Sequence, residues 1–269
     1  MKRIALSFLA ITGLLVSCSS DDDNSNAEMN IQYIVDKIYD YNNNLLAEYF
    51  YNDNDQLIKF DRVFNEELLA TYEFDYQNGS IFQIDYENFE MPSFNHSIYL
   101  FYNQEERLIK DEMHQSGNII EINEYTYNEN GEIQEVESQS EGLNTISIYN
   151  YFDSENIEQV IRRFPEFDDG GNPTGNSIEI RFEYEYDQGL KPNFGIGNIF
   201  QIEPLPAFGT EAMFAKNMSA NNMTRNLSTG TQWIYTYNEN NLVETIEIIW
   251  EGVETEEPLL LNIVYKELN

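Results

Sequence analysis

The stretch Tyr125-Thr126-Tyr127-Asn128-Glu129-Asn130-Gly131, followed by Ile133, carries the strongest structural signal in this chain. Side chains alternate between the two faces of a β-strand, so Tyr125 and Tyr127 share one face. The Asn and Gly residues that follow accept a positive φ and suit a tight turn. Ile133 then resumes an apolar strand. The stretch therefore predicts two strands joined by a turn.

The same pattern recurs along the chain. Close copies lie at 49–58, 99–109 and 235–243, and weaker copies begin at residues 39, 74, 149 and 184. The last tyrosines before the turns fall at 51, 76, 102, 127 and 151, with spacings of 25, 26, 25 and 24 residues. A fixed period of this size indicates a repeat architecture, and each period has room for about two strands and two turns.

The predicted fold is therefore all-β: an antiparallel meander of hairpin repeats that forms either an open curved sheet or a barrel-like wrap. Tyr, Phe, Ile and Val favour strands, and the Asn-rich turns recur too often to leave room for amphipathic helices. The pattern resembles the YD (Tyr-Asp) repeat, Tyr-x-Tyr-Asp-x-x-Gly-Arg-Leu, over residues 33–190 and 233–269. Here Asn usually replaces the Asp, and the Gly and Arg are mostly missing. Large YD-repeat proteins wind their sheet into a closed shell, for which this chain has too few units.

An insert at about 187–232 interrupts the period. Pro192-Asn193-Phe194 and Ser219-Ala220-Asn221-Asn222-Met223-Thr224 occur in it in that order. Together they resemble the insert of a family of Bacteroidota surface lipoproteins of unknown function, which have YD-like repeats. The alanines of the insert predict a short helix near Gly209–Met218 with its apolar side on the sheet. The alternative is a loop held by Phe194 and Phe208.

The first seventeen residues predict a signal peptide. Lys2 and Arg3 are followed by an apolar run at 4–16, which is shorter than the roughly 20 residues that a spanning helix needs. Leu15-Val16-Ser17-Cys18 resembles the lipobox of bacterial lipoproteins. That resemblance implies cleavage before Cys18 and acyl chains on this residue. An ordinary secretory signal with a chance cysteine is the alternative.

Residues 18–30 are expected to form an acidic flexible tether ahead of a single β-repeat domain at 31–269. Ser19, rather than Asp, follows the cysteine, which by resemblance implies the outer membrane. The cluster Ser20-Asp21-Asp22-Asp23 resembles a surface-export signal. A merely solvated linker has the same composition.

The charge balance restricts the partners. The chain has 14 Lys and Arg residues against 48 Asp and Glu residues, a net charge of −34. Binding to nucleic acid requires clustered positive charge, so no nucleic-acid partner is expected. The same balance argues against lying flat on anionic lipid. The expected partners are the membrane, through the lipid anchor, and a glycan or protein ligand.

Signs of catalysis are sparse. His96 and His114 are the only histidines and Cys18 is the only cysteine, so no metal-ligand spacing is present. We expect both histidines to be surface residues of strands or turns, and we expect no cofactor. The segment Asp168–Asn172 is either a calcium ligand set or, as favoured, a polar turn.

The sequence therefore favours a non-catalytic binding module for an extracellular glycan, polymer or protein. Trp233 and Trp250 are the first candidates for ligand contact, because indole rings stack on sugars and anchor protein partners. A structural protein of the cell envelope without a small ligand is the alternative. A carbohydrate-active hydrolase is the third possibility, since 48 acidic residues guarantee many carboxylate pairs.

Overall fold

Sixteen strands and one α-helix make up most of the chain that the computed structural model describes, namely residues 32–140, 142–152, 156–196, 202, 209–251 and 258–268. The predicted signal peptide, Cys18 and the tether lie outside these residues and remain predictions. The strands are β1 (Tyr33–Asp40), β2 (Leu45–Tyr51), β3 (Leu57–Phe64), β4 (Glu67–Gln77), β5 (Ser80–Asn88), β6 (His96–Tyr102), β7 (Leu108–Gln115), β8 (Asn118–Tyr127), β9 (Ile133–Ser140), β10 (Leu143–Tyr151), β11 (Ile157–Phe167), β12 (Pro173–Leu190), β13 (Asn221–Asn226), β14 (Gln232–Tyr237), β15 (Val243–Ile249) and β16 (Leu259–Glu267). The helices are α1 (Gly209–Met218) and the single 3-10 turn η1 (Pro92–Phe94).

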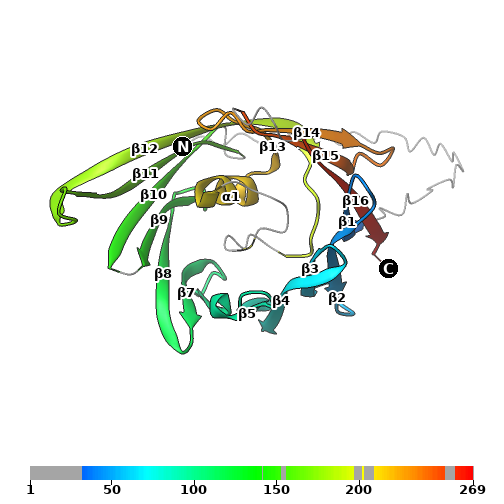
Figure 1. Cartoon of the computed structure of the whole chain (residues 1–269), viewed down its shortest axis with the longest axis horizontal. Coiled ribbons are helices and arrows are strands. Elements are labelled where there is room, and N and C mark those ends of the chain that lie inside the picture. Colours follow the sequence, from blue (N-terminus) through cyan, green and yellow to red (C-terminus); the bar gives the residue numbers. More distant parts are fainter. Residues whose placement is uncertain are drawn as a thin grey trace, which may run out of the picture. The chain divides into compact units, whose positions relative to one another are not determined.

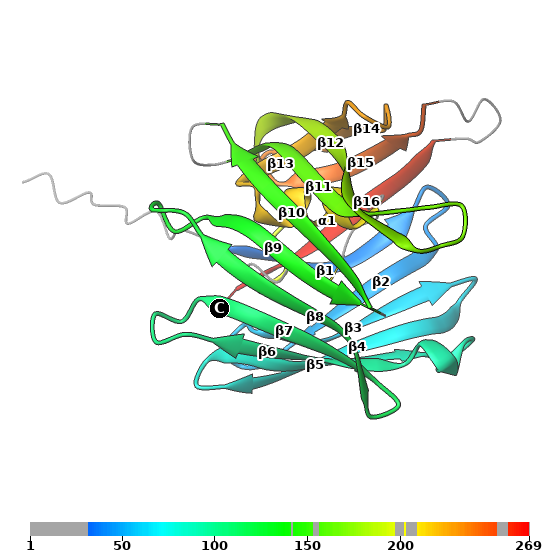
Figure 2. The same ribbon diagram turned by 90° about the vertical axis from the view of Figure 1, so that its left-hand side faces the viewer.

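Each strand pairs antiparallel with its neighbours in sequence, and β16 pairs with β1, so the sheet closes into a barrel (Figure 1 and Figure 2). Tyr33 lies opposite Glu267, and Asp40 lies opposite Leu261. The predicted antiparallel meander is confirmed, and the barrel-like wrap is the form observed. An open sheet would leave the backbone donors and acceptors of β1 and β16 unpaired, whereas closure removes both edges.

The loops after Tyr-x-Tyr are shaped by the Asn that follows the second tyrosine. The Oδ1 atom of Asn128 accepts hydrogen bonds from the backbone N–H groups of Asn130 and Glu132, both at 3.0 Å. The loop then needs a residue with positive φ, which is Gly131 at 84°. The sequence pattern therefore encodes a loop in which a side chain replaces a backbone acceptor. The same pair of bonds forms at Asn52, Asn103 and Asn238.

A β-bulge follows each of these loops. Phe101 lies opposite Lys110 and Tyr102 lies opposite Leu108, so Ile109 is the extra residue. The bulge turns Leu108 into the core and leaves Ile109 41% exposed. Two adjacent apolar residues at the start of a strand therefore face opposite sides of the sheet. The same register shift occurs in β1, β3, β5, β9, β11 and β15.

The last tyrosine of a repeat closes the bulge of the preceding repeat. Tyr102 donates its hydroxyl to the backbone O of Ile81 at 2.8 Å, and Tyr127 donates to that of Leu108 at 2.5 Å. Burial raises the pKa of the Tyr102 hydroxyl to about 12, so it remains a donor at neutral pH. We call these contacts the tyrosine clamps. Those among the described residues are Tyr51–Val35, Tyr76–Leu57, Tyr102–Ile81, Tyr127–Leu108, Tyr151–Ile133 and Tyr265–Val243.

The helix α1 lies within the ring of strands (Figure 1), which confirms the predicted helix over Gly209–Met218. The loop alternative for this segment is wrong. Ala212 and Ala215 are buried, and the ring of Phe214 lies 6.4 Å from that of Tyr149 on the barrel wall. The ammonium group of Lys191 donates hydrogen bonds to backbone carbonyls at the end of the helix. These bonds satisfy the acceptors that every helix C-terminus leaves open.

The outward face of the barrel carries charged pairs. Lys37 lies 2.7 Å from Glu48 on the neighbouring strand, and Lys110 lies 2.6 Å from Glu112. The residue beside Glu48 in sequence, Ala47, is buried in the barrel. The strand alternation therefore directs Ala47 into the core and Glu48 to the outside.

We expect Tyr102→Phe to lower the free energy of unfolding by roughly 1 to 2 kcal/mol, because it leaves the carbonyl of Ile81 without its donor. Urea denaturation followed by fluorescence measures the change. Tyr41→Phe is the matched control, since Tyr41 is 60% exposed. Equal stability of the two variants would contradict a structural role for the clamp.

Candidate functional site

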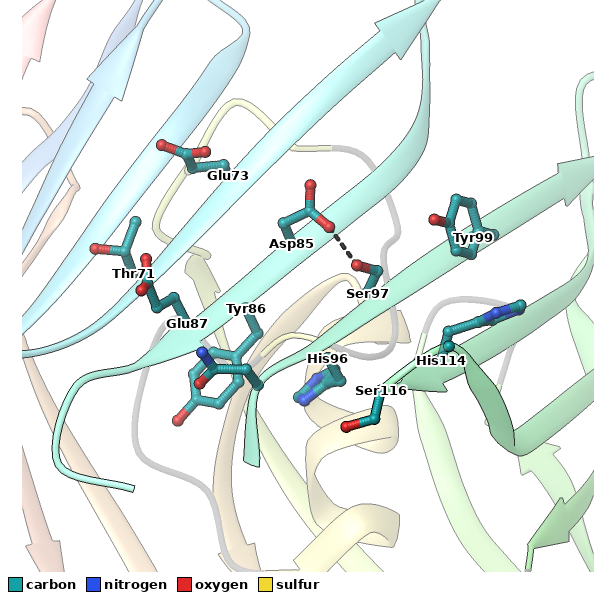
Figure 3. Close-up of a pocket in the computed structure, with 12 residues that line it drawn as sticks. Thr71, Glu73, Asp85, Tyr86, Glu87, His96, Ser97, Tyr99, His114 and Ser116 are labelled. Carbon is teal, nitrogen blue, oxygen red and sulfur yellow. Dashed lines mark hydrogen bonds between the residues drawn. The ribbon is translucent and has the colours of Figure 1, made fainter. Parts of the chain in front are cut away.

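A hollow of about 330 Å³ lies over the outer face of β4, β5, β6 and β7, beside the loop at 89–95 and the turn at 116–117 (Figure 3). We call it the β4–β7 pocket. Three carboxylates, both histidines of the chain and one outward tyrosine line it: Glu73, Asp85, Glu87, His96, His114 and Tyr99. It joins residues as far apart in sequence as Glu73 and His114.

Strand pairing builds one row of polar side chains across this pocket. Glu73 lies opposite Asp85, Asp85 lies opposite Ser97, and Ser97 lies opposite His114. Directly opposed residues on adjacent strands have their Cβ atoms about 4.5–5.5 Å apart. The row therefore sets four functional groups side by side on one face of the sheet.

The carboxylate of Asp85 is held by its neighbours. Ser97 Oγ donates a hydrogen bond to Asp85 Oδ1 at 2.5 Å (Figure 3). Gln83 Nε2 donates to both carboxylate oxygens, at 3.0 and 2.9 Å. These bonds restrict the side-chain rotamer of Asp85, so an acceptor with a defined direction is presented to the pocket.

His114 joins an aromatic ring to a charged pair. Its Nε2 atom lies 3.1 Å from Glu112 Oε2, and its ring packs edge-on against Tyr99 with 4.8 Å between centroids. The hydrogen bond from Lys110 is the main cause that holds the pKa of Glu112 below its ordinary value, and the hydrogen bond from His114 is the second cause. His114 is thus fixed in place between Tyr99 and Glu112.

His96 borders the pocket from the inner side of the sheet. Its Nδ1 atom lies 2.8 Å from the backbone O of Phe94 and therefore donates, which leaves Nε2 as the acceptor of the neutral ring. The imidazole extends a column of rings along the inner face, with centroids 4.8 Å from Tyr86 and then 4.7 Å from Tyr86 to Tyr72. This column orients the loop at 89–95 beside the pocket.

The hydrogen bonds of Ser97 and His114 do not join these two residues as a nucleophile and its base. The proton of Ser97 points to Asp85 and not to an imidazole, and His114 is paired with Glu112. A nucleophilic serine needs a base that accepts its proton and a third group that orients this base. The arrangement instead places oriented hydrogen-bond acceptors and an aromatic surface in one hollow.

Among the residues that the structure describes, no cluster of three or more His, Cys, Asp or Glu side chains is arranged to hold a metal ion. In the same part of the chain, no helix has the length and apolar character needed to cross a membrane.

The two tryptophans predicted to contact a ligand are not in this pocket. Trp233 is 1% exposed inside the barrel, where the ammonium group of Lys216 lies 5.7 Å from its ring. Trp250 is half-buried and packs against the core. Both side chains contribute to packing in this structure. The alternation of side chains along β14 directs Trp233 into the barrel, beside Lys216 of α1.

The other sequence candidates also have positions in the structure. The Oδ1 atom of Asp168 accepts hydrogen bonds from the backbone N–H groups of Gly170 and Asn172, as expected for a polar turn.

His96 and His114 are on strands, as expected, but the sequence did not predict that both line one pocket. The turn between β6 and β7 suggests that Ser97 and His114 approach each other. The bulge at Ile109 shifts the register between β6 and β7 by one residue. Counting residues outward from the turn therefore assigns Ser97 the wrong partner on β7.

A family model described only as "Uncharacterised protein" matches residues 65–164. No curated protein matches the chain. Among solved structures, a porin-like protein from Bacteroides uniformis is 15% identical with a TM-score of 0.49, over 82% of this chain and 89% of that one. A porin-like protein from Bacteroides vulgatus is 10% identical with a TM-score of 0.45, over 87% and 99%. The TcdB2-TccC3 structure has 10% identity and a TM-score of 0.26, over 81% of this chain and 12% of that one.

The lowered pKa of Glu112 gives a pH prediction. Its contacts with Lys110 and His114 stabilise the fold above the unfolded pKa, which is about 4.5, and this stability is lost as the pH falls through the folded pKa. We expect Glu112→Gln to reduce the decline of the urea midpoint between about pH 5 and pH 3. Glu129→Gln, an exposed loop change, serves as the control and keeps the wild-type decline. Identical pH profiles for Glu112→Gln and wild type would contradict this role.

Proposed function

We propose that this chain is a lipid-anchored binding module of the outer membrane, displayed at the cell surface and without catalytic activity, whose ligand is an extracellular glycan. The observation that carries the proposal is the paired row of Glu73, Asp85, Ser97 and His114 beside the ring of Tyr99. It gives one hollow both directional acceptors and an aromatic surface.

The chemistry of the β4–β7 pocket suits a sugar. Hydroxyl groups donate to carboxylates such as Asp85 and Glu73, and an aromatic ring packs on the apolar side of a sugar ring. The volume of about 330 Å³ is at the lower end of the range of small-molecule sites. Because Ser97 and Gln83 already order Asp85, little side-chain entropy is lost on binding.

The anchor is part of the same proposal. A barrel that spans a bilayer has an outward apolar band, whereas outward positions here carry pairs such as Lys37–Glu48 and Lys110–Glu112. We therefore propose that the barrel lies outside the bilayer and is held there by acyl chains on Cys18. The acidic composition of the chain keeps it soluble at the surface.

A second candidate is a structural or envelope-interaction protein without a small ligand. The tyrosine clamps favour it, because the hydroxyls of the repeated tyrosines are used by backbone carbonyls such as those of Ile81 and Leu108. The repeat itself therefore serves the fold. Apart from Tyr99, which begins the copy at 99–109, the lining residues lie outside the repeat pattern, and this is why we favour binding. A hydrolase is the less favoured alternative, since Asp85 accepts bonds from both Ser97 and Gln83.

The binding proposal is tested with residues 18–269 carrying Cys18→Ser, screened on a glycan array and then by calorimetry. We expect Asp85→Asn and Tyr99→Ala each to weaken glycan binding about tenfold or more, since each removes a central contact. Tyr41→Ala, at an exposed loop away from the pocket, should leave affinity unchanged. Binding that survives both pocket variants, or no glycan binding at all, would contradict the proposal and favour the structural alternative.

The anchor is tested in cells that express the full chain. We expect wild-type protein to incorporate labelled palmitate and to partition into detergent, and Cys18→Ser to lose both, because no other cysteine is present. Ser25→Thr, which lies outside the motif at Leu15–Cys18, is the control for expression. Labelling that persists in Cys18→Ser would refute the assignment of the anchor. Protease treatment of intact cells then tests surface display.

A further inference from the structure

We infer that one end of the barrel carries a docking surface for a basic, apolar segment of a partner protein. The surface, which we call the apolar rim, lies at the β3–β4 and β5–β6 hairpin ends. It shares no lining residue with the β4–β7 pocket, although the loop at 89–95 borders both, and it has a different partner. Its members are Phe64, Leu68, Phe89, Met91 and Phe94, with exposed fractions between 41% and 58%.

The two hairpin ends are neighbours. The backbone N–H of Phe89 donates to the O atom of Leu69 at 3.0 Å, which joins the β5–β6 loop to β4. Both ends lie on the same side of the barrel, at the right in Figure 2. Single exposed apolar residues are common on protein surfaces, but five large ones on two adjoining hairpin ends mark an interaction site.

The longer of the two loops is held in shape by hydrogen bonds. Asn88 Oδ1 accepts from the backbone N–H of Met91 at 2.7 Å, and Asn95 Oδ1 accepts from the N–H of Asn88 at 2.8 Å. Gln115 Nε2 reaches from β7 to the backbone O of Ser93 at 2.7 Å. The apolar side chains therefore project from an ordered loop, and a partner does not have to order it on binding.

The charge of the rim selects the partner. Glu66, Glu67 and Glu90 are exposed between the apolar side chains, and none of them is in an ion pair within the described residues. No Lys or Arg occurs in the hairpin ends at 64–68 and 88–95. A surface that is both apolar and acidic is complementary to a segment with apolar anchors flanked by Lys or Arg.

The same charges oppose the other occupants of an apolar surface. A second copy of this chain would bring acidic rims together, at a cost from like-charge repulsion. A bilayer rich in anionic lipid would repel the same carboxylates, and the rim has no Lys or Arg to attract its headgroups. The basic protein segment is the occupant that satisfies both the apolar and the acidic character.

Residues 18–269 with Cys18→Ser are titrated with a fluorescent 14-residue peptide of alternating Lys and Leu, and with a Lys/Ser peptide of equal charge. We expect the Lys/Leu peptide to bind at least about tenfold more tightly than the Lys/Ser peptide. The rim variant Phe64→Ser/Phe89→Ser/Met91→Ser should lose this preference. Ile109→Thr/Ile234→Thr/Val264→Thr, which changes three exposed outer-face residues, is the matched control and should keep it.

A second variant, Glu66→Gln/Glu67→Gln/Glu90→Gln, keeps the apolar groups and should weaken the Lys/Leu peptide about tenfold. The three glutamates are exposed, so this variant tests the rim even if the serine variant unfolds. Equal binding of both peptides, or unchanged binding in the glutamine variant, overturns the proposal. Rim-dependent binding to vesicles of phosphatidylethanolamine and phosphatidylglycerol, or rim-dependent self-association in sedimentation, overturns it in favour of lipid or a second copy. None of these outcomes depends on glycan binding by the pocket.

Discussion

The hydrogen bond from a tyrosine hydroxyl to the carbonyl of a bulged residue is the contact on which this barrel depends. A bulge adds a residue to one strand, increases its local twist and interrupts the ladder of backbone bonds. The carbonyl left at the bulge is buried beside residues such as Leu108 and needs a donor. Tyr127 supplies it from the next repeat. Repetition of the unit thus gives a strongly twisted sheet, whose two edge strands meet and pair.

Closure assigns opposite tasks to the two faces of the sheet. The inner face buries the apolar residues of the repeat together with α1, so Trp233 and Phe214 are part of the core. The outer face carries charged pairs as well as exposed apolar residues such as Ile109, and it is free to vary in chemistry without loss of packing. The β4–β7 pocket and the apolar rim both use residues that the repeat does not need. Both proposed binding surfaces therefore use outward positions and hairpin ends, which agrees with the general location of binding residues on loops and exposed surfaces.

Much of the fold was predictable because its signals are local. The Tyr-x-Tyr-Asn pattern predicts strand, loop and strand from alternation and turn chemistry, and the alanines of the insert predict the helix over Gly209–Met218. The β4–β7 pocket was not predictable from local patterns in the same way. Trp233 and Trp250 were chosen for their chemistry, but the sequence does not state which face of the sheet an isolated aromatic side chain takes. His96 and His114 looked like unrelated surface residues until strand pairing placed them at one pocket.

The sequence by itself therefore determined the period, the strands, the loops with their Asn side chains, and the position of the helical insert, since each depends on contacts within a few residues. It also contains the motif at Leu15–Cys18 that predicts a lipid anchor. Only the tertiary structure decided that β1 pairs with β16, that α1 lies inside the barrel, and that Asp85, Ser97 and His114 lie in one row. The physical reason is that pairing across the barrel and the one-residue shift at each bulge are long-range properties, which depend on the whole sheet and not on any segment of it.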